Sequence, residues 1–224
     1  MSDALKVLSL LRRRPGLDAA GFSLHWRTTH KEHALTLVRA GFFRGYVQNH
    51  AHETQPEGLE SAADGMPELW IDDLSALERL AASREYCEGA GPDEANFVQP
   101  PVLSCIARER VLTGLRHADL PAGAVKLILL AMRPPGRPPA RFEAGWLAGE
   151  DGWWAPAHAP LRLTRQVAVE TGTPSPFDGA DCSWWPDAAA AQQAWRAAAA
   201  HARRIAGPLR GLLVIEDVVL PPST

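Results

Sequence analysis

Two imidazoles interrupt an apolar stripe on one face of a helix predicted over residues 19–39. At 100° per residue, the side chains within about 80° of one another are Phe22, Trp26, His30, His33 and Leu37. A histidine exchanges a proton near neutral pH, so His30 at this position predicts a general base or acid. The bulky apolar neighbours indicate a small-molecule pocket between this helix and a sheet. A buried histidine that only bonds a backbone carbonyl or Asp64 gives the same pattern, and this structural interpretation stays open.

Polar side chains also alternate along a strand-like run over residues 43–53. Those on one face are Tyr46, Gln48, His50 and His52. If this face is turned toward the stripe that contains Trp26, the pocket holds imidazoles, a phenol and an amide. If it is turned to solvent, the same residues form the ordinary polar side of a half-buried sheet. His52 lies near the end of the strand and is expected to be exposed.

An Asp-Gly pair occurs twice, as Asp64-Gly65 and as Asp178-Gly179. Such a pair is typical of a turn that enters a strand, and its recurrence favours that structural role. Asp64 is also predicted as a candidate catalytic residue, because a carboxylate that bonds His30 or His50 would orient the imidazole.

The eight histidines raise the question of a metal site. His30 and His33 lie one helical turn apart and could share an ion, with His50 as a third ligand. However, no HExxH or other closely spaced ligand pattern is present, and Glu32 points elsewhere on the helix. No GxGxxG, P-loop or serine-hydrolase motif occurs either. The sequence therefore predicts neither a metal nor another cofactor.

Composition restricts the class of partner. The formal charge of −3 without a basic block argues against nucleic acid and against an anionic membrane. No run approaches the ~18–20 apolar residues of a membrane span, and the N-terminal charges follow the apolar run, unlike a secretion signal. The three cysteines are odd in number and far apart, which fits a reducing cytosol. We expect a cytoplasmic protein whose partner is a small-molecule substrate.

The chain repeats itself at a constant offset. Without a gap, the matching residues are Lys6 and Lys126, Pro15-Gly16 and Pro135-Gly136, Phe22 and Phe142, and Trp26 and Trp146. Further along, Trp70 answers Trp184 after the two Asp-Gly pairs. A repeat of this length predicts two fused small domains rather than a solenoid. We place the first domain at residues 1–112, a linker at 113–123 and the second domain at 124–224.

Each copy is predicted to follow the order β-α-β-β-α-β of a ferredoxin-like unit. In the first copy we expect a strand from Ala4 to 13, a helix at 19–39 with Asp18 as its N-cap, strands at 43–53 and 65–72, a short helix at 73–84 and a strand at 102–112. In the second copy we expect a strand at 124–132, a helix at 138–147, strands at 161–170 and 180–185, a helix from the Asp187 cap to Gly207 and a strand at 209–220. A sheet with helices on one face must bury its other face, and the tethered twin is the nearest partner. The predicted fold class is α+β, with two antiparallel sheets paired into an α+β barrel as an intramolecular pseudo-dimer. A further homodimer stays open.

Several short motifs in the first copy occur in an order that resembles the EthD family. They are Arg14-Pro15-Gly16, Phe22, His25-Trp26, His30, Tyr46-Val47-Gln48-Asn49-His50, Asp64-Gly65 and Glu68-Leu69-Trp70. The resemblance covers most of residues 5–112 and implies a dimeric α+β barrel. The second copy resembles the family less, since Gly145 stands at the position of His25 and Val167 at that of His50. This unequal divergence favours the first copy as the one that carries the chemistry.

The resemblance implies several kinds of activity. EthD relatives are linked to ether degradation, and some fungal members resemble dehydratases of aromatic polyketide pathways. The wider superfamily includes cyclases, isomerases, cofactor-free monooxygenases and haem-binding peroxidases, among which the fold alone does not choose. We predict a cofactor-independent lyase, cyclase or isomerase that acts on a small apolar or aromatic carbonyl compound. The alternatives are a cofactor-free monooxygenase and a non-catalytic small-molecule-binding or assembly protein.

The predicted enzyme gives each candidate residue a role. His30 moves the proton, while His50 or Tyr46 holds the developing oxyanion. Phe22 and Trp26 form the apolar wall. The other candidate site residues are Asp64 as a carboxylate partner, and His33, Gln48 and Trp70 as substrate-binding residues. Because Trp26 and Trp70 recur in the second copy, both also qualify as core residues.

Overall fold

The chain is an α+β protein that divides into two compact units. The computed structural model describes residues 5–148, 152–154, 156–206 and 209–222. Unit 1 contains Met1–His50, Ala63–Ile106 and Glu216–Thr224, and unit 2 contains Ala51–Ala62 and Ala107–Ile215. Ala4, the predicted start of the first strand, and Gly207, the predicted end of the last helix, lie outside the described residues.

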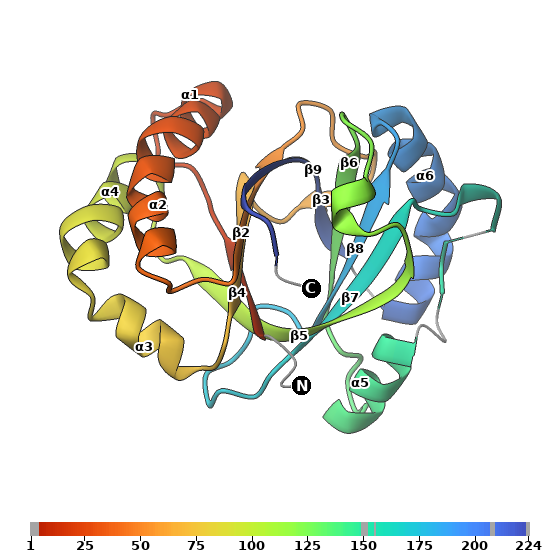
Figure 1. Ribbon diagram of the computed structural model, residues 1–224. Helices are drawn as coiled ribbons and strands as arrows, with labels where there is room; N and C mark the ends of the chain where they lie inside the picture. Colours follow the sequence, from red (N-terminus) through yellow and green to blue (C-terminus); the bar gives the residue numbers. More distant parts are fainter. Residues whose placement is uncertain (1–4, 149–151, 155, 207–208, 223–224) are drawn as a thin grey trace. The chain divides into compact units, whose positions relative to one another are not determined.

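Unit 1 places helices on one side of a small sheet (Figure 1). Its strands are β1 (Leu5–Leu10), β2 (Gly45–Ala51), β4 (Gly65–Ile71) and the start of β5 (Leu103–Gly114), in the order β2-β4-β1-β5. Its helices are α1 (Ala19–His25), α2 (Lys31–Arg39), α3 (Ser75–Ala81) and α4 (Gly91–Phe97). One π-helical turn, Trp26–His30, joins α1 to α2, and another, Tyr86–Ala90, leads into α4. This arrangement brings α4 against the first π-helical turn.

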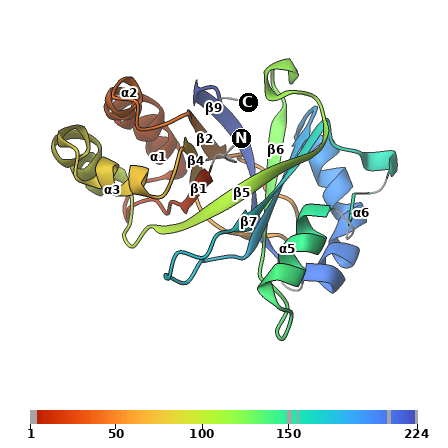
Figure 2. The ribbon, with the colours of Figure 1, turned by 60° about the horizontal axis from the view of Figure 1, so that its bottom comes forward.

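In unit 2, two helices lie on the same side of the strands (Figure 2). After the rest of β5, its strands are β7 (Arg162–Ala168), β8 (Gly179–Trp185), β6 (Val125–Ala131), β9 (Arg210–Leu220) and the short β3 (Glu60–Ser61), in that order. Its helices are α5 (Pro139–Ala148) and α6 (Ala188–Ala206), with 3-10 turns at His117–Asp119 and Pro156–His158. The core between helices and sheet is built around Phe142, Trp146 and Trp195.

The two units do not follow the predicted domains along the chain. Residues 51–62 and 107–112, predicted in the first domain, pack with unit 2, whereas residues 216–222, predicted in the second, pack with unit 1. Strands β5 and β9 each continue from one unit into the other, with the boundaries after Ile106 and Ile215. Residues 51–62 belong to unit 2 because they contain β3, which pairs with the start of β9. A division of the sequence alone does not reveal such shared strands.

The predicted helices and strands agree with the structure to within a few residues, but several short elements were missed. The sequence predicted no element over residues 85–101, where the structure has the second π-helical turn and α4, and it did not predict β3 or the two 3-10 turns. Two predicted helix caps are confirmed. Asp18 Oδ1 accepts from Gly21 N at 2.7 Å, and Asp187 Oδ1 accepts from Ala190 N at 2.8 Å.

The repeated lysines and tryptophans hold equivalent positions in the two units. Lys6 of β1 lies opposite Trp70, and Lys126 of β6 lies opposite Trp184. Each ammonium sits over the partner ring, at 4.3 Å from the Trp70 centroid and 4.7 Å from the Trp184 centroid. Lys6 Nζ also contacts Glu68 Oε2 at 3.2 Å. Both lysines are buried, and the ring face offsets part of the cost of removing their charge from water.

Candidate active site

Two histidines of unit 1 share one face of the first long helix because that helix contains a π-helical turn. In a regular α-helix, residues five apart point about 140° away from each other. The π-helical turn Trp26–His30 widens the helix to i→i+5 spacing, which brings His25 and His30 together. Such turns occur frequently at functional sites.

One carboxylate, that of Asp93, joins the two imidazoles. His25 Nε2 lies 2.9 Å from Asp93 Oδ1, and His30 Nδ1 lies 3.0 Å from Asp93 Oδ2. An ionised carboxylate only accepts hydrogen bonds, so each of these ring nitrogens donates. For neutral His30 this leaves Nε2 with a free lone pair, which is the form of a general base. The geometry is that of an imidazole oriented by a carboxylate.

Helix α4 holds Asp93 in place for this contact. Asn96 Nδ2 donates to Asp93 Oδ1 at 3.0 Å. The Phe97 ring packs against both imidazoles, with centroid distances of 5.0 Å to His25 and 4.9 Å to His30. The side chains of His25 and His30 are 25% and 11% exposed. The cluster of His25, His30 and Asp93 is therefore largely shielded from water but still accessible to a small molecule.

Burial and hydrogen bonding act in opposite directions on the pKa values of His30 and Asp93. Burial lowers the pKa of His30 from 6.5, while the hydrogen bond and the charge of Asp93 act to raise it. Burial also acts to raise the pKa of Asp93, but hydrogen bonds from Asn96, His30 and His25 outweigh it, so that this pKa lies below its ordinary value. At neutral pH, His30 is therefore neutral and Asp93 is ionised.

The predicted strand face points inward, as its polar residues form a buried chain of hydrogen bonds. Ser23 Oγ lies 2.9 Å from His50 Nδ1, and His50 Nε2 lies 3.0 Å from Gln48 Oε1. Gln48 Nε2 donates to the Tyr46 hydroxyl oxygen at 2.9 Å and to the Trp26 carbonyl at 3.2 Å. Both ring nitrogens of His50 are thus engaged within the protein.

Tyr46 is the last residue in this series of hydrogen bonds, and its hydroxyl group stays protonated. Its hydroxyl oxygen accepts from Gln48 Nε2 and from Trp26 Nε1, the latter at 3.3 Å. Burial raises the pKa of Tyr46 to about 12, although these two donors act in the opposite direction. The phenol therefore stays protonated at neutral pH, with its O–H as a candidate donor to a bound oxygen.

Asp64, predicted as a catalytic carboxylate, lies with Arg13 rather than with a histidine. Asp64 Oδ2 accepts from Arg13 N at 2.9 Å, and Asp64 Oδ1 accepts from Arg13 Nη1 at 2.5 Å. Asp178 holds Arg133 in the same way, since Arg133 N donates to Asp178 Oδ2 at 2.7 Å. The recurrent Asp-Gly pair thus ties the turn before β4 or β8 to the chain that follows β1 or β6.

The remaining predicted residues occupy several places in unit 1. Phe22 and Trp26 are buried and their ring centroids lie 5.7 Å apart. His33 is half-buried beside Gly89 of the second π-helical turn, and Trp70 lies under Lys6 on the sheet. The structure thus joins Tyr46, Gln48 and His50 to Trp26 and sets His30 apart with Asp93. Whether these residues act on a substrate stays a prediction.

Sequence reasoning missed Asp93, Ser23 and the partnership of His25 with His30. A signal for Asp93 was present: Gly91-Pro92-Asp93-Glu94 is typical of the first turn of a helix, with proline early and acidic residues after it. No sequence pattern indicated the π-helical turn.

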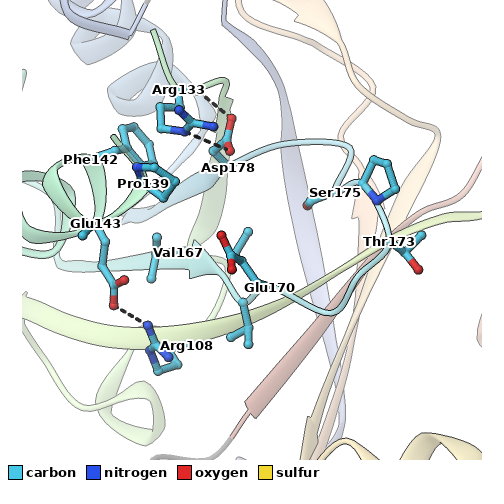
Figure 3. Close-up of a pocket in the computed structure, with 14 residues that line it drawn as sticks. Arg108, Arg133, Pro139, Phe142, Glu143, Val167, Glu170, Thr173, Ser175 and Asp178 are labelled. Atoms are coloured by element: carbon cyan, nitrogen blue, oxygen red, sulfur yellow. Dashed lines mark hydrogen bonds and ion pairs between the residues drawn. The ribbon is translucent and has the colours of Figure 1, made fainter. Parts of the chain in front are cut away.

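The structure contains a hollow of about 620 Å³ in unit 2, lined by residues of β5, α5 and the end of β7 (Figure 3). None of the predicted site residues lines it. Within the described ranges, no three histidine, cysteine or acidic side chains come together in a way that could hold a metal ion.

A comparison with known protein families finds a match over the part of the chain that contains His25, His30 and Asp93. Residues 14–101 match the model of the EthD domain. This segment is an EthD domain. It includes every residue of the cluster and of the buried chain from Ser23 to Tyr46. No curated protein matches the chain significantly.

The whole chain, EthD domain included, shares its fold with several solved structures. An anthrone oxidase-like protein matches with a TM-score of 0.57 and 14% identity, covering 99% of this chain and 97% of its own. A proposed monooxygenase of Lactobacillus acidophilus matches with 0.53 and 7%, over 99% and 97% of the two chains. A chlorite dismutase variant of Candidatus Nitrospira defluvii matches with 0.55 and 10%, over 98% and 93%. These identities establish the fold alone.

In the described ranges, no helix has the length and apolar character needed to cross a lipid bilayer.

Proposed function

We propose that the EthD domain removes a proton from a carbon atom whose acidity is raised by a directly attached or conjugated carbonyl group of a small aromatic compound, with His30 as the base. The observation that carries this proposal is the hydrogen bond from His30 Nδ1 to Asp93 Oδ2 at 3.0 Å. It leaves His30 Nε2 as the acceptor of the proton, and Asp93 stabilises the imidazolium that forms.

The fate of the resulting enolate decides the reaction class. Return of the proton at another atom gives an isomerase, and loss of a hydroxyl group gives a dehydratase or, with ring closure, a cyclase. The isomerase, dehydratase and cyclase reactions are the functions that we propose first. The O–H group of Tyr46 is the candidate donor to the enolate oxygen. His50 contributes indirectly, because both of its ring nitrogens are bonded to Ser23 and Gln48.

A cofactor-free monooxygenase is the second candidate, and it needs the same first step. Its support is that an anthrone oxidase-like protein and a proposed monooxygenase share the fold over nearly the whole chain. In that reaction the substrate carbanion reduces O2, so that a CH2 group and O2 become a carbonyl group and water.

We also propose that the chain is a duplication, with copies at residues 1–112 and 124–224 that pair as an intramolecular pseudo-dimer. The equivalent lysine–tryptophan pairs of β1 with β4 and of β6 with β8 support this origin. In this proposal the first copy carries the proton transfer, since Val167 and Gly145 replace two of its histidines.

A carbon acid such as anthrone tests the proton transfer separately from any oxidation. Under nitrogen in D2O, the protein is expected to accelerate deuterium incorporation at the CH2 group, as followed by NMR. The substitution His30→Gln is expected to lower this rate by about a hundredfold or more, the usual contribution of a general base. Admission of air then distinguishes the second candidate, because only a monooxygenase consumes O2 and yields the quinone.

The matched control is His52→Gln, since the ring of His52 is hydrogen-bonded to the backbone of Thr54 in its own loop. This variant is expected to keep the exchange rate within about twofold. If folded His30→Gln protein exchanges the proton as fast as the unchanged protein, His30 is not the base.

A further inference from the structure

The hollow of unit 2 lies between helix α5, the end of strand β7 and the loop that follows this strand (Figure 3). Its volume of about 620 Å³ falls within the roughly 300–1,000 Å³ typical of small-molecule sites. Pro139, Phe142 and Val167 supply an apolar wall, while hydroxyl and charged groups supply the rest of the lining.

In the described part of unit 2 no helix corresponds to α4, and this absence accounts for the hollow. In unit 1, Phe97 at the end of α4 packs on Phe22 with a centroid distance of 5.6 Å, and Val98 pairs with Arg13. Phe142 is the repeat counterpart of Phe22, but the described chain of unit 2 passes from α6 to β9 without another helix. The space beside Phe142 that α4 would occupy therefore stays open.

One carboxylate in the lining of the hollow is not paired with another described residue. Arg108 is paired with Glu143, and Arg133 is held by Asp178 through its backbone N–H and its guanidinium. Glu170 makes no hydrogen bond or ion pair with another described residue. Its carboxylate lies in the middle of the view, between the two paired arginines (Figure 3). The lining thus has two guanidinium groups and three carboxylates, which favours a ligand with one positive charge.

We propose that this hollow is a second ligand site that binds a small organic ammonium ion. The ammonium group pairs with Glu170, and the apolar body of the ligand lies against Phe142, Pro139 and Val167. A carboxylate ligand would have to displace Glu143 or Asp178 from its arginine and would meet Glu170 as a like charge. The site does not depend on the chemistry of His30, which belongs to unit 1.

Three probes of one size and different charge test this proposal on the full chain: benzylammonium, benzyl alcohol and benzoate. Titrations at pH 7 and low salt, followed by NMR, are expected to rank them in that order. For ligands of this size we expect a Kd for benzylammonium on the order of 1 mM. Tighter binding of benzoate than of benzylammonium, or no binding of benzylammonium, overturns the proposal.

Substitutions locate the binding. Glu170→Gln is expected to weaken benzylammonium about threefold to fivefold, as for a solvent-exposed ion pair, and to leave benzyl alcohol unchanged. Glu85→Gln, at an exposed carboxylate of unit 1, is the matched control and is expected to change neither. Ala140→Trp, at an exposed position of α5 that lines the hollow, is expected to weaken both by about tenfold or more.

His30→Gln is expected to retain this binding in full, which separates it from the proposed proton transfer. Binding that is insensitive to both Glu170→Gln and Ala140→Trp would place the ammonium elsewhere and overturn the proposal.

Discussion

At the residue scale, two histidines of unit 1 differ in how their ring nitrogens are hydrogen-bonded. His30 bonds a carboxylate through one nitrogen and keeps the other as an acceptor. His50 bonds Ser23 and Gln48 through both nitrogens and packs 4.5 Å from the Trp26 ring. The sequence predicted both as catalytic candidates, because residue type and period reveal which face a histidine occupies and not which partners it meets.

The buried, neutral state of His50 predicts a pH dependence of stability. Burial and nearby Arg27 lower its pKa from 6.5 to about 4, against an opposing effect of Asp217. Below about pH 6.5 the unfolded chain takes up a proton that folded His50 refuses. The free energy of unfolding should therefore fall by about 1.4 kcal/mol per pH unit as pH drops toward about 4, and this contribution is fully present above pH 6.5.

Urea unfolding between pH 7 and pH 5 checks this expectation. The variant His50→Gln should show a shallower loss of stability over this window than the unchanged protein. Equal slopes for the two proteins would mean that His50 does not stay neutral when folded.

At the element scale, one extra residue in a helix turn makes the cluster. The sequence predicted a single helix over residues 19–39, and its start and end are confirmed by the Asp18 cap and by α2 ending at Arg39. The π-helical turn could not be predicted, because its cost is met by tertiary contacts of His25, His30 and Phe97. Helix α4 was missed because seven residues give too few periods for an apolar pattern.

Removal of one residue from the π-helical turn tests its role. Thr29 is exposed, and its deletion should restore regular α-helical hydrogen bonding while the flanking segments keep their faces. In the shortened chain His25 and His30 would be four residues apart, about 40° around a regular α-helix, so both would still face Asp93. We therefore expect a folded protein by circular dichroism with a deuterium exchange rate close to that of the unchanged protein, because the turn acts only by bringing the two histidines to one face.

The substitution Thr29→Ala keeps the length of the turn and is the matched control. It should exchange at the original rate. A folded deletion variant that has lost the exchange activity would show that the turn does more than bring His25 and His30 to one face.

At the scale of the whole molecule, each unit has a glycine whose missing side chain leaves room for a buried tryptophan ring. A Cβ atom on Gly65 would lie 2.5 Å from Trp26 Cζ3, and one on Gly179 would lie 2.8 Å from Trp146 Cε2. The Asp-Gly pairs were therefore predicted correctly as a structural feature, although the contact with the rings lay beyond sequence reasoning. The division into units was not predictable, since β5 and β9 serve both.

Alanine at these glycines should destabilise the protein by about 1–3 kcal/mol each, because the rings are buried and cannot move away. Gly145 of α5 is the contrasting site, with nothing within 4 Å of an added Cβ. Gly145→Ala should raise stability by about 0.5–1 kcal/mol through helix propensity. Thermal and urea unfolding measure all three variants. Gly65→Ala and Gly179→Ala proteins as stable as the unchanged chain would contradict the packing.

The pH dependence of deuterium exchange into anthrone, for the unchanged protein and for Asp93→Asn, tests the His30–Asp93 pair most directly. Because the pKa of His30 lies below 6.5 and Asp93 acts to raise it, the rate should be constant at neutral pH and fall only in acid. Asp93→Asn should lower the plateau by about tenfold to a hundredfold and move the acid limb to lower pH. An acid limb that stays at the same pH in Asp93→Asn, with an unchanged plateau, would contradict His30 as a base positioned by Asp93.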